Sequence, residues 1–288
     1  MINVILQGRL GNRLFQYAVA RHLAIKNNTT VRFNIESCIN RYNIFDRKVI
    51  KELSLFNITP MNYTAKIHKK IGRKLGIVRS IHNGRVYHQT DWGFFPEVLE
   101  LKDGVYLDGS FQSEKYFKDI EKIIRNDLRF RNDPFVKEYP IYKEQITKLN
   151  SVGLHVRRGD YLEMNMLNVC NMKYYANSIE YMLDRLLSPH FFVFSDDIEW
   201  CSENFHMPNC CFVNIEASKK NPIIDFKLMS LCKHNIISNS TFSWWAAWLN
   251  EHPEKIVVAP NRWFNEESMN IKALRDTIPD DWIHMDFQ

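Results

Sequence analysis

The chain has 288 residues, of which 45% are hydrophobic and 25% are charged, and its formal net charge at pH 7 is +5. These proportions are typical of a globular protein, so they exclude a disordered, collagen-like or coiled-coil chain. The length suits one large or two smaller compact domains, and no internal repeat recurs along the chain.

Positive charge is concentrated in the first half of the chain. Residues 1–150 hold 26 Lys and Arg against 15 Asp and Glu, a net +11, whereas residues 151–288 hold 12 against 18, a net −6. Residues 66–85 contain seven Lys and Arg residues and no Asp or Glu, and their apolar residues recur at helical spacing. Such a segment is compatible with a helix docked on its own domain or with peripheral contact to an anionic membrane. Because interleaved aromatic residues are missing, we expect no nucleic-acid partner.

The cysteines and the apolar runs of the sequence indicate where in the cell the protein is expected. The six cysteines form no C-x-x-C pair, and no histidine stands at zinc-ligand spacing, so neither a disulfide framework nor a structural metal is expected. The first residues are typical of a strand rather than a signal peptide, and no run approaches the roughly 18 apolar residues of a membrane span. We expect a cytoplasmic protein, peripheral on the inner membrane face if residues 66–85 contact lipid.

Apolar runs of strand length alternate with longer helical patterns, which predicts an α/β fold with parallel sheets. Apolar residues that recur at helical spacing from Leu14 to Ala24 indicate a first helix. A polar stretch between Pro134 and Asn150 predicts a linker. The predicted strands occupy residues 3–7, 151–156, 190–195, 235–237 and 255–259.

Parallel sheets present functional groups at the carboxyl ends of their strands. After the strand 151–156 comes His155-Val-Arg157-Arg158-Gly-Asp160. Two adjacent arginines at such a position need an anion or a carboxylate beside them, and guanidinium groups match phosphate oxygens bidentately. We expect one arginine to bind phosphate and Asp160 to brace the other.

Residues 238–243, with the sequence Ser-Asn-Ser-Thr-Phe-Ser, precede a helix. Their hydroxyls can cap that helix, and free backbone N–H groups at its positive end can bind an anion. With the two arginines they predict a phosphate pocket that needs no metal. Asp196 and Asp197, after the strand 190–195, could hold a divalent cation, but we favour helix capping for them.

The turn between the first strand and the first helix contains Gly8 and Gly11, which permit a close backbone approach to a ligand. Their spacing is not the dinucleotide fingerprint. Three polar residues in the same turn, Arg9, Asn12 and Arg13, favour a loop that faces a ligand.

Together these segments resemble glycosyltransferase family 11, the bacterial α-1,2-fucosyltransferases, in order and up to about Pro260. The resemblance implies an α/β, GT-B-like fold with two Rossmann-like parallel-sheet domains facing a cleft: residues 1–145 on the acceptor side and residues 146–288 binding the GDP-sugar. It further implies GDP-β-L-fucose as donor, inversion at the anomeric carbon and no metal or other cofactor. The motifs are Gly8-Arg-Leu-Gly-Asn-Arg-Leu-Phe-Gln-Tyr-Ala, Gly109-Ser-Phe-Gln-Ser-Glu-Lys-Tyr-Phe, His155-Val-Arg-Arg-Gly-Asp-Tyr, Phe194-Ser-Asp-Asp and Ser238-Asn-Ser-Thr-Phe-Ser-Trp-Trp.

Carried over residue by residue, the resemblance implies that Arg157 and Asn12 are catalytic, with Arg157 on the diphosphate. The chain departs from the family at Arg9, Arg13 and Ser110, which leaves the acceptor preference open. The residues implied to bind the donor are Gly11, His155, Arg158, Asp160, Asp225, Ser240, Thr241, Phe242 and Ser243.

The implied reaction transfers L-fucose to the 2-hydroxyl of a terminal galactose in an oligosaccharide or lipid-linked glycan. Two alternatives stay open: a GDP-sugar transferase with another sugar or linkage, and a non-catalytic carbohydrate-binding protein. Asp91, Asp108 and Glu163 are weak candidates for the general base, and an oxocarbenium-like transition state could proceed without one.

Overall fold

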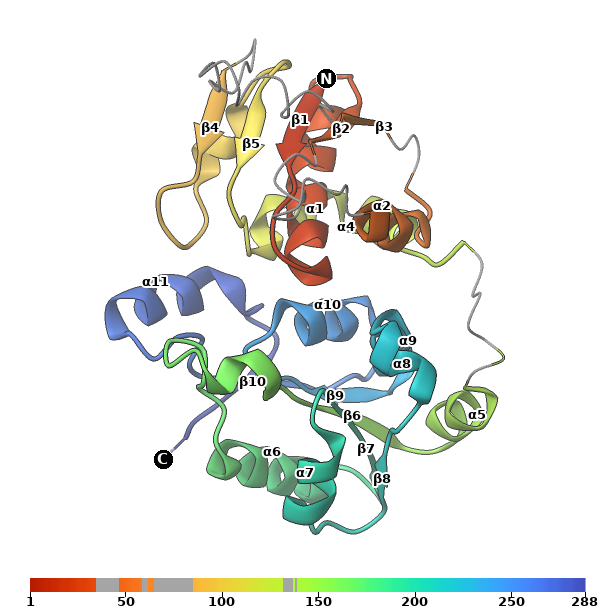
Figure 1. Cartoon of the computed structure of the whole chain (residues 1–288). Helices are drawn as coiled ribbons and strands as arrows, with labels where there is room; N and C mark the ends of the chain where they lie inside the picture. The colour runs from red at the N-terminus through yellow and green to blue at the C-terminus, as the bar shows by residue number, and fades with distance from the viewer. Residues whose placement is uncertain (35–46, 59–61, 65–84, 132–136, 138, 288) are drawn as a thin grey trace, which may run out of the picture. The chain divides into compact units, whose positions relative to one another are not determined.

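The computed structural model describes residues 1–34, 47–58, 62–64, 85–131, 137 and 139–287, which form two compact units, Met1–Asn132 and Asp133–Gln288 (Figure 1). The boundary between the units thus falls before the predicted one at 145/146, which lies inside a helix of the second unit, α5 (Pro140–Lys148). The prediction of a linker is therefore wrong for residues 140–148, which form a helix. Proline is tolerated in a first helical turn, and Ile146 of α5 is fully buried, so this polar stretch folds as a helix.

The first unit is built on a five-stranded parallel sheet with the order β3-β2-β1-β5-β4. Its strands are β1 (Ile2–Ile5), β2 (Val31–Asn34), β3 (Asn62–Thr64), β4 (Val86–His88) and β5 (Tyr106–Asp108). Its helices are α1 (Leu10–Lys26), α2 (Arg47–Ser54), η2 (Pro96–Glu100), η3 (Glu114–Tyr116), η4 (Lys118–Ile120) and α4 (Glu121–Asp127). The predicted first strand and first helix are confirmed, with the strand starting and ending earlier than expected.

The second unit is a six-stranded parallel sheet with the order β11-β10-β9-β6-β7-β8. Its strands are β6 (Ser151–Val156), β7 (His190–Ser195), β8 (Cys210–Phe212), β9 (His234–Ile236), β10 (Val257–Pro260) and β11 (Ile283–Met285). Its further helices are η5 (Gly159–Leu162), α6 (Met172–Arg185), α7 (Ile198–Asn204), α8 (Glu216–Lys220), α9 (Ile223–Leu231), α10 (Thr241–Leu249) and α11 (Glu267–Thr277).

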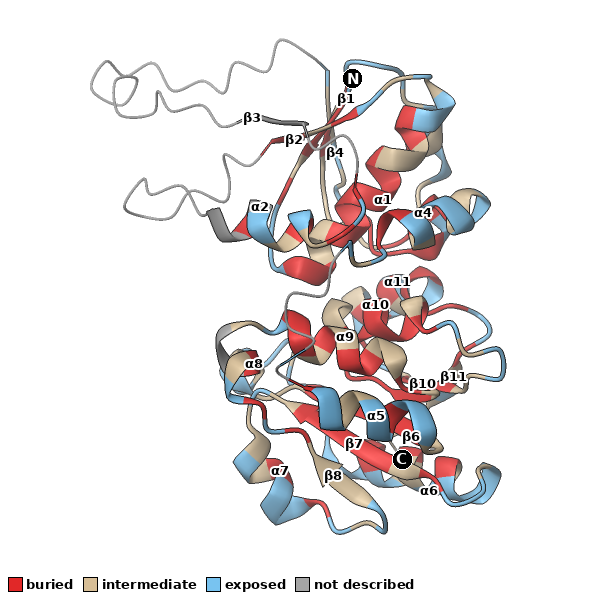
Figure 2. Cartoon of the chain, turned by 90° about the vertical axis from the view of Figure 1, so that its right-hand side faces the viewer, coloured by how far each residue is buried: buried red, intermediate tan, exposed pale blue. Residues whose placement is uncertain are grey.

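Chain order reverses once in the second sheet. From β6 the chain adds β7 and β8 on one side, then returns to add β9, β10 and β11 on the other, and helices cover both faces of the sheet (Figures 1 and 2). This is the strand order of the doubly wound nucleotide-binding fold, in which ligands bind at the carboxyl ends of the two strands where the order reverses. In this unit those strands are β6 and β9.

The core of the second unit explains its aromatic helix. All six residues of β6 are buried, as strands covered on both faces require (Figure 2). Trp244 and Trp245 of α10 are fully buried, and the Trp244 indole donates a hydrogen bond to the carbonyl of Thr277, at 2.8 Å. These tryptophans therefore pack in the core of the unit.

The basic segment 66–85 lies, except for its last residue, outside the described residues, so the helix expected there stays a prediction. Within the described part of the chain, no helix combines the length and the apolar character that crossing a membrane requires.

Candidate active site

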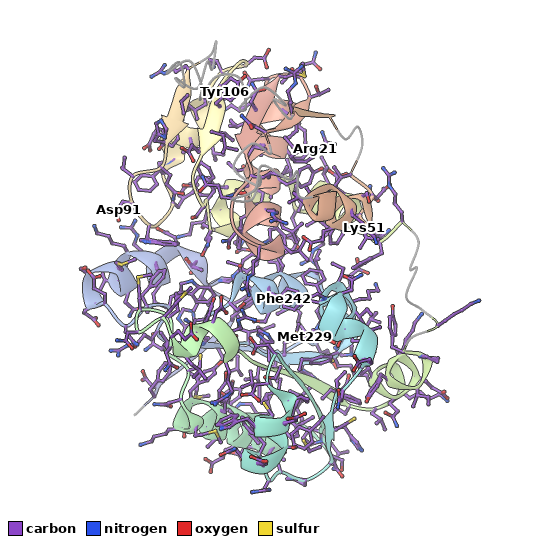
Figure 3. All side chains as sticks on the ribbon, in the orientation of Figure 1. Arg21, Lys51, Asp91, Tyr106, Met229 and Phe242 are labelled. Atoms are coloured by element: carbon purple, nitrogen blue, oxygen red, sulfur yellow. The ribbon has the colours of Figure 1, made fainter. Side chains whose placement is uncertain are left out.

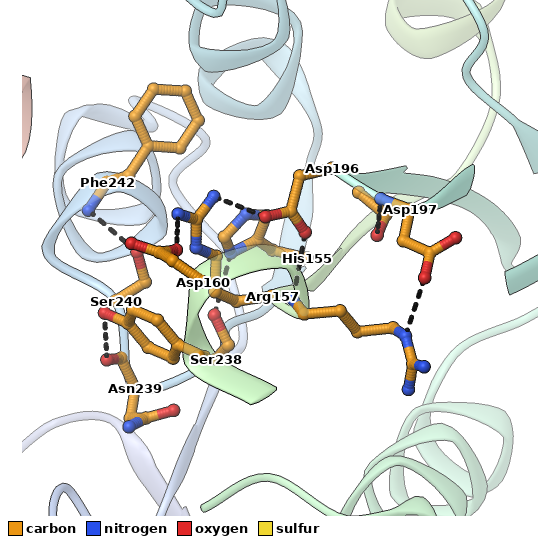
Figure 4. Close-up of polar contacts among 12 residues, drawn as sticks. His155, Arg157, Asp160, Asp196, Asp197, Ser238, Asn239, Ser240 and Phe242 are labelled. Atoms are coloured by element: carbon orange, nitrogen blue, oxygen red, sulfur yellow. Dashed lines mark hydrogen bonds and ion pairs between the residues drawn. The ribbon is translucent and has the colours of Figure 1, made fainter. Parts of the chain in front are cut away.

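The carboxyl ends of β6 and β9 meet in the second unit, as the switch-point topology requires. The imidazole Nδ1 of His155, on β6, lies 2.8 Å from the hydroxyl of Ser238, which follows β9 (Figure 4). Just beyond β6, the Tyr161 hydroxyl lies 3.5 Å from the carbonyl of Asn239. The structure therefore brings together the two segments that the sequence predicts to form a phosphate pocket.

His155 is a buried, neutral imidazole at the centre of this edge. It is 6% exposed, and its ring centroid lies 5.9 Å from that of Phe242. Burial, with a smaller contribution from the positive charge of Arg157, lowers the pKa of His155 to about 3. At neutral pH the ring therefore offers hydrogen-bonding atoms without a charge.

Arg157 is held between two carboxylates (Figure 4). One terminal nitrogen pairs with Asp160, and the other lies 2.6 Å from Oδ2 of Asp196. The side chain is 17% exposed. Asp160 thus pairs with Arg157, the arginine expected on the diphosphate, whereas the sequence led us to expect it beside the other arginine.

Arg158 points toward α7. Its Nε lies 3.0 Å from Oδ2 of Asp197, and its guanidinium carbon stacks 3.6 Å from the ring centroid of Trp200. The other oxygen of Asp197 accepts a hydrogen bond from the Trp200 amide, so the predicted capping role of Asp197 is confirmed. Asp196 has another role, since its Oδ1 accepts the backbone N–H of Arg158 at 2.9 Å. A Cβ at Gly159 would meet Oδ2 of Asp196, so the carboxylate would have to move to admit a side chain there.

The charges of this cluster, defined as Arg157, Arg158, Asp160, Asp196 and Asp197, sum to −1. An incoming phosphate therefore competes with carboxylates for the guanidinium groups. Across the described residues, no group of three His, Cys, Asp or Glu side chains is placed to hold a metal ion.

The N-terminus of α10 lies beside this end of β6. Ser240 is the N-cap, and its hydroxyl accepts a hydrogen bond from the amide of Phe242 at 3.4 Å. Ser243 is 1% exposed and its hydroxyl contacts the Ser240 carbonyl at 3.3 Å. The partly exposed side chains of this helix end are those of Thr241 and Phe242, so these two can reach a ligand without rearrangement.

Asp225 lies in the first turn of α9, which packs on α10 through the rings of Phe226 and Phe242, 5.3 Å apart. Figure 3 labels Phe242 and Met229 on these two helices. Burial raises the pKa of Asp225 to about 7, against a smaller lowering by a hydrogen bond from Ser218. Its Oδ1 is buried and has no hydrogen-bond partner among the described residues. A buried oxygen in this state favours a donor supplied by a ligand.

In the first unit β1 and β5 are neighbours in the sheet, and hydrogen bonds connect the loops that follow them. The Gln16 side chain accepts the amide of Gln7 at 3.0 Å and donates to the carbonyl of Gly109 at 3.0 Å. The Gln112 amide donates to Oδ1 of Asn12 at 3.2 Å. Gly8 has a φ of +67°, which explains the glycine in this turn.

The structure therefore contains two candidate clusters, one in each unit. Gly11 and Asn12 belong to the first, and the remaining predicted site residues belong to the second. A common cleft between the units stays a prediction. Sequence reasoning missed Gln7 and Gln16 as parts of the first cluster, because a lone glutamine gives no signal before its partners are known.

Comparison with known proteins identifies the family. The model of glycosyl transferase family 11 matches residues 99–286. The chain is 30% identical to an α-1,2-colitosyltransferase of Escherichia coli over 98% of this chain and 97% of the relative. It is 32% identical to the O-antigen biosynthesis glycosyltransferase WbnK of Escherichia coli, over 97% and 99%. A galactoside α-(1,2)-fucosyltransferase 1 of Saimiri boliviensis boliviensis matches a shorter region, at 36% identity over 55% of this chain and 46% of that protein.

Among solved structures, the fucosyltransferase NodZ from Bradyrhizobium superposes with a TM-score of 0.52 at 14% sequence identity, over 85% of this chain and 92% of that one. This likeness shows the fold, which is the predicted GT-B architecture of two parallel α/β domains. With the family model and two relatives that match almost the whole sequence, the comparisons establish that this chain is a glycosyltransferase and belongs to glycosyltransferase family 11.

Proposed function

We propose that this glycosyltransferase transfers L-fucose from GDP-β-L-fucose to the 2-hydroxyl of a terminal galactose, with inversion and without a metal ion. The acceptor is an oligosaccharide or a lipid-linked glycan. The names of the relatives support an α-1,2 linkage. The structurally similar NodZ α-1,6-fucosyltransferase, which was soaked with GDP-fucose, supports a GDP-sugar donor. The observation that carries the proposal is the junction of the Arg157 strand end with the N-terminus of α10, held by the contact between His155 and Ser238.

In this mechanism the galactose oxygen attacks the anomeric carbon while GDP leaves. Negative charge grows on the β-phosphate as the bond to the sugar breaks, and donors already in position stabilise that charge most effectively. Arg157 is such a donor, because Asp160 and Asp196 hold its guanidinium in place before the ligand arrives. The positive end of α10 adds backbone N–H groups and a partial positive charge.

The nucleoside would bind between β6 and α9. The neutral ring of His155 can exchange hydrogen bonds with guanosine, and the unpaired Oδ1 of Asp225 can accept from the base. An ionised carboxylate is the better acceptor. Because the pKa of Asp225 is raised to about 7, GDP should bind more tightly as the pH rises from 6 to 8.

The experiment is a screen of β-galactoside acceptors with GDP-fucose in the presence of a chelator. We expect GDP release that depends on the acceptor, with an α-1,2 linkage in the product by NMR. Loss of activity on chelation would contradict the metal-independent mechanism, and a different linkage would contradict the acceptor assignment.

A second donor is favoured by one relative, whose name gives colitose as the transferred sugar. Both readings use the same diphosphate site, so they differ only in the sugar. A panel of GDP-sugars that includes GDP-colitose separates them by the ratio of kcat/KM values, and binding without turnover of any donor would indicate a carbohydrate-binding protein instead.

Cytoplasmic location and membrane contact through residues 66–85 are proposals from the sequence alone. The charge and spacing of that segment support contact with anionic lipid. Flotation with anionic liposomes should carry the chain upward. If charge reversal at Lys69, Lys70, Arg73 and Lys74 leaves the binding unchanged, the idea is wrong.

A further inference from the structure

The first unit holds a histidine–aspartate pair at the carboxyl edge of its sheet. His88 is the last residue of β4 and Asp108 the last residue of β5, and the two are paired in the parallel register. Nδ1 of His88 lies 2.8 Å from Oδ2 of Asp108. The side chains are 65% and 28% exposed, respectively, so the imidazole is open to solvent while its partner is partly covered.

The pair belongs to the edge where ligands bind in sheets of this type. β5 pairs in parallel with the central strand β1, and ligands of open α/β sheets bind outside the carboxyl ends of the strands. Gln7, which follows the neighbouring strand β1, donates a hydrogen bond to Oδ1 of Asp108. Both carboxylate oxygens of Asp108 are thus engaged, one by His88 and the other by Gln7.

The backbone after Asp108 is fixed as well. The side-chain oxygen of Gln89, the residue after His88, accepts the amides of Ser110 and Phe111 at 2.9 and 2.8 Å. A Cβ at Gly109 would collide with Gln89, so the two strand ends approach as closely as glycine allows. The pair is therefore held by contacts on both sides and not by its own attraction alone.

The hydrogen bond determines which nitrogen can act as a base. An ionised carboxylate only accepts hydrogen bonds, so Nδ1 of His88 carries the proton that Asp108 accepts. The neutral ring then has its lone pair on Nε2, for which the structure gives no partner among the described residues. This is the arrangement in which a carboxylate orients a histidine to receive a proton.

We propose that His88 is the general base for the acceptor hydroxyl and that Asp108 is the residue that positions it. The inference rests on the proposed function. In the transfer step the acceptor oxygen forms its bond to the anomeric carbon, its proton passes to Nε2 of His88, and the bond from that carbon to the β-phosphate oxygen breaks, leaving its electron pair on GDP. The imidazolium then returns the proton to water.

The other acidic candidates are less suited to this task. Oδ1 of Asp91, labelled in Figure 3 in the loop after β4, accepts the amide of Trp92 at 2.8 Å. Glu163 belongs to the second unit, next to the cluster around Arg157. Asp108 has both oxygens occupied, so it serves the imidazole and not the substrate directly.

The competing explanation is an exposed ion pair that only adds a little stability. Kinetics of His88→Gln, Asp108→Asn and the control His190→Gln separate the two roles. His190 is a partly exposed histidine at the start of β7, where Nδ1 contacts the Ser188 carbonyl at 3.1 Å, and it lies at the opposite end of its strand from the Arg157 cluster. Transfer from GDP-fucose to a β-galactoside is measured from pH 5.5 to 8.5, together with the Kd for GDP.

We expect His88→Gln to lower kcat by on the order of 10²–10⁴-fold, the usual contribution of a general base, and to abolish the acidic limb of kcat measured at saturating donor. GDP affinity and the melting temperature should stay at wild-type values, as should all properties of His190→Gln. Asp108→Asn removes the carboxylate that orients the imidazole, so we expect a loss of kcat that is smaller than in His88→Gln.

The experiment distinguishes failure of this inference from failure of the proposed function. If the wild type transfers sugar but His88→Gln keeps its kcat and its acidic limb, this inference is overturned while the proposed function survives. If the wild type transfers no sugar from any GDP-sugar in the panel, the proposed function fails and the inference falls with it.

Discussion

At the scale of single residues, we expect turnover to depend most on the side chain of Arg157. Replacing it with alanine removes a donor from the leaving diphosphate, and loss of one such donor costs on the order of 10²–10³-fold in kcat. The fold should survive, because the side chain lies at a strand end and not in the apolar core. Arg185→Ala is the matched control, since that guanidinium stacks 3.7 Å from the ring centroid of Tyr181 and belongs to the end of α6.

Steady-state kinetics at saturating donor, with circular dichroism for the fold, measure this effect. An Arg157→Ala variant that keeps the wild-type kcat would show that the leaving group is stabilised elsewhere. The surrounding carboxylates make the result informative: without Arg157 the cluster carries a charge of −2, which repels a diphosphate.

Asp225 should show opposite effects on stability and on binding. Its pKa is raised to about 7 in the folded chain, above its ordinary value of 3.8, so the folded chain keeps a proton that the unfolded chain has lost. Stability therefore falls as the pH rises from 3.8 to 7, by up to about 1.4 kcal/mol for each pH unit. Asparagine cannot ionise, so Asp225→Asn should be more stable than the wild type at pH 8 and similar at pH 4.

The same substitution removes the acceptor that we assign to the nucleoside. We therefore expect Asp225→Asn to weaken GDP binding at pH 8, where the wild-type carboxylate is ionised. Urea denaturation at the two pH values and calorimetric titration with GDP measure both effects. Unchanged GDP affinity would place the nucleoside away from α9.

At the scale of elements, the N-cap of α10 links helix stability to the donor site. Ser240→Ala removes the hydroxyl that accepts the Phe242 amide, and loss of such a cap costs about 1 kcal/mol. Asn171→Ala removes the equivalent cap of α6, where the side chain accepts the Tyr174 amide at 2.9 Å. Both variants should lose similar stability, but only Ser240→Ala should lower kcat/KM for the donor. Equal kinetics in the two would show that the α10 cap is purely structural.

The elements that sequence reasoning predicted well are those with strong local signals. β6, β7 and α1 have continuous apolar runs or a clear helical face, and their positions agree with the structure. α5 was missed because only Ile146 of its nine residues is buried, so its pattern is mostly polar. A helix of this kind depends on its neighbours for stability, and its own periodicity is weak.

In the site too, residues in short local motifs could be predicted, whereas partners that are distant in the sequence could not. The arginines after β6 and the cap of α10 could be predicted, because each is a short motif at the end of a strand. The partners of those arginines could not, since Asp196 comes from a different strand end that only the sheet order brings near. His88 gave no signal in the sequence at all, because its meaning depends on its register with Asp108.

At the scale of the whole molecule, the two units have a similar architecture. Each is a parallel sheet with a polar cluster at the carboxyl ends of neighbouring strands, although among the described strands chain order reverses in the second sheet and not in the first. The charges differ, however: Met1–Asn132 carries a net +11 and Asp133–Gln288 a net −6, counted as 23 Lys and Arg against 12 Asp and Glu, and 15 against 21. The unit that holds the cluster around Arg157 is thus the acidic one, so the phosphate binding that we propose there would depend on local donors and not on the overall field.

The stability of the chain should decrease in mild acid, because two buried histidines are neutral. Burial lowers the pKa of His155 to about 3 and that of His234 to about 4. Below pH 6.5 these histidines bind protons in the unfolded chain but stay neutral in the folded chain. Their contribution to the free energy of unfolding is therefore full above pH 6.5 and is lost as the pH falls toward 4. Each contributes about 1.4 kcal/mol per pH unit at most, and Asp225, with its raised pKa, offsets one of them.

Replacing His234 should therefore flatten this dependence. Its Nδ1 accepts the Ile256 amide at 3.0 Å, and the side-chain oxygen of an asparagine can take over that hydrogen bond. We expect His234→Asn to reduce the slope of the unfolding free energy against pH by close to one proton between pH 6 and 4.5, whatever its effect at pH 7. Urea denaturation at several pH values measures the slope, and an equal slope in the variant and the wild type would show that His234 does not cause the acid sensitivity.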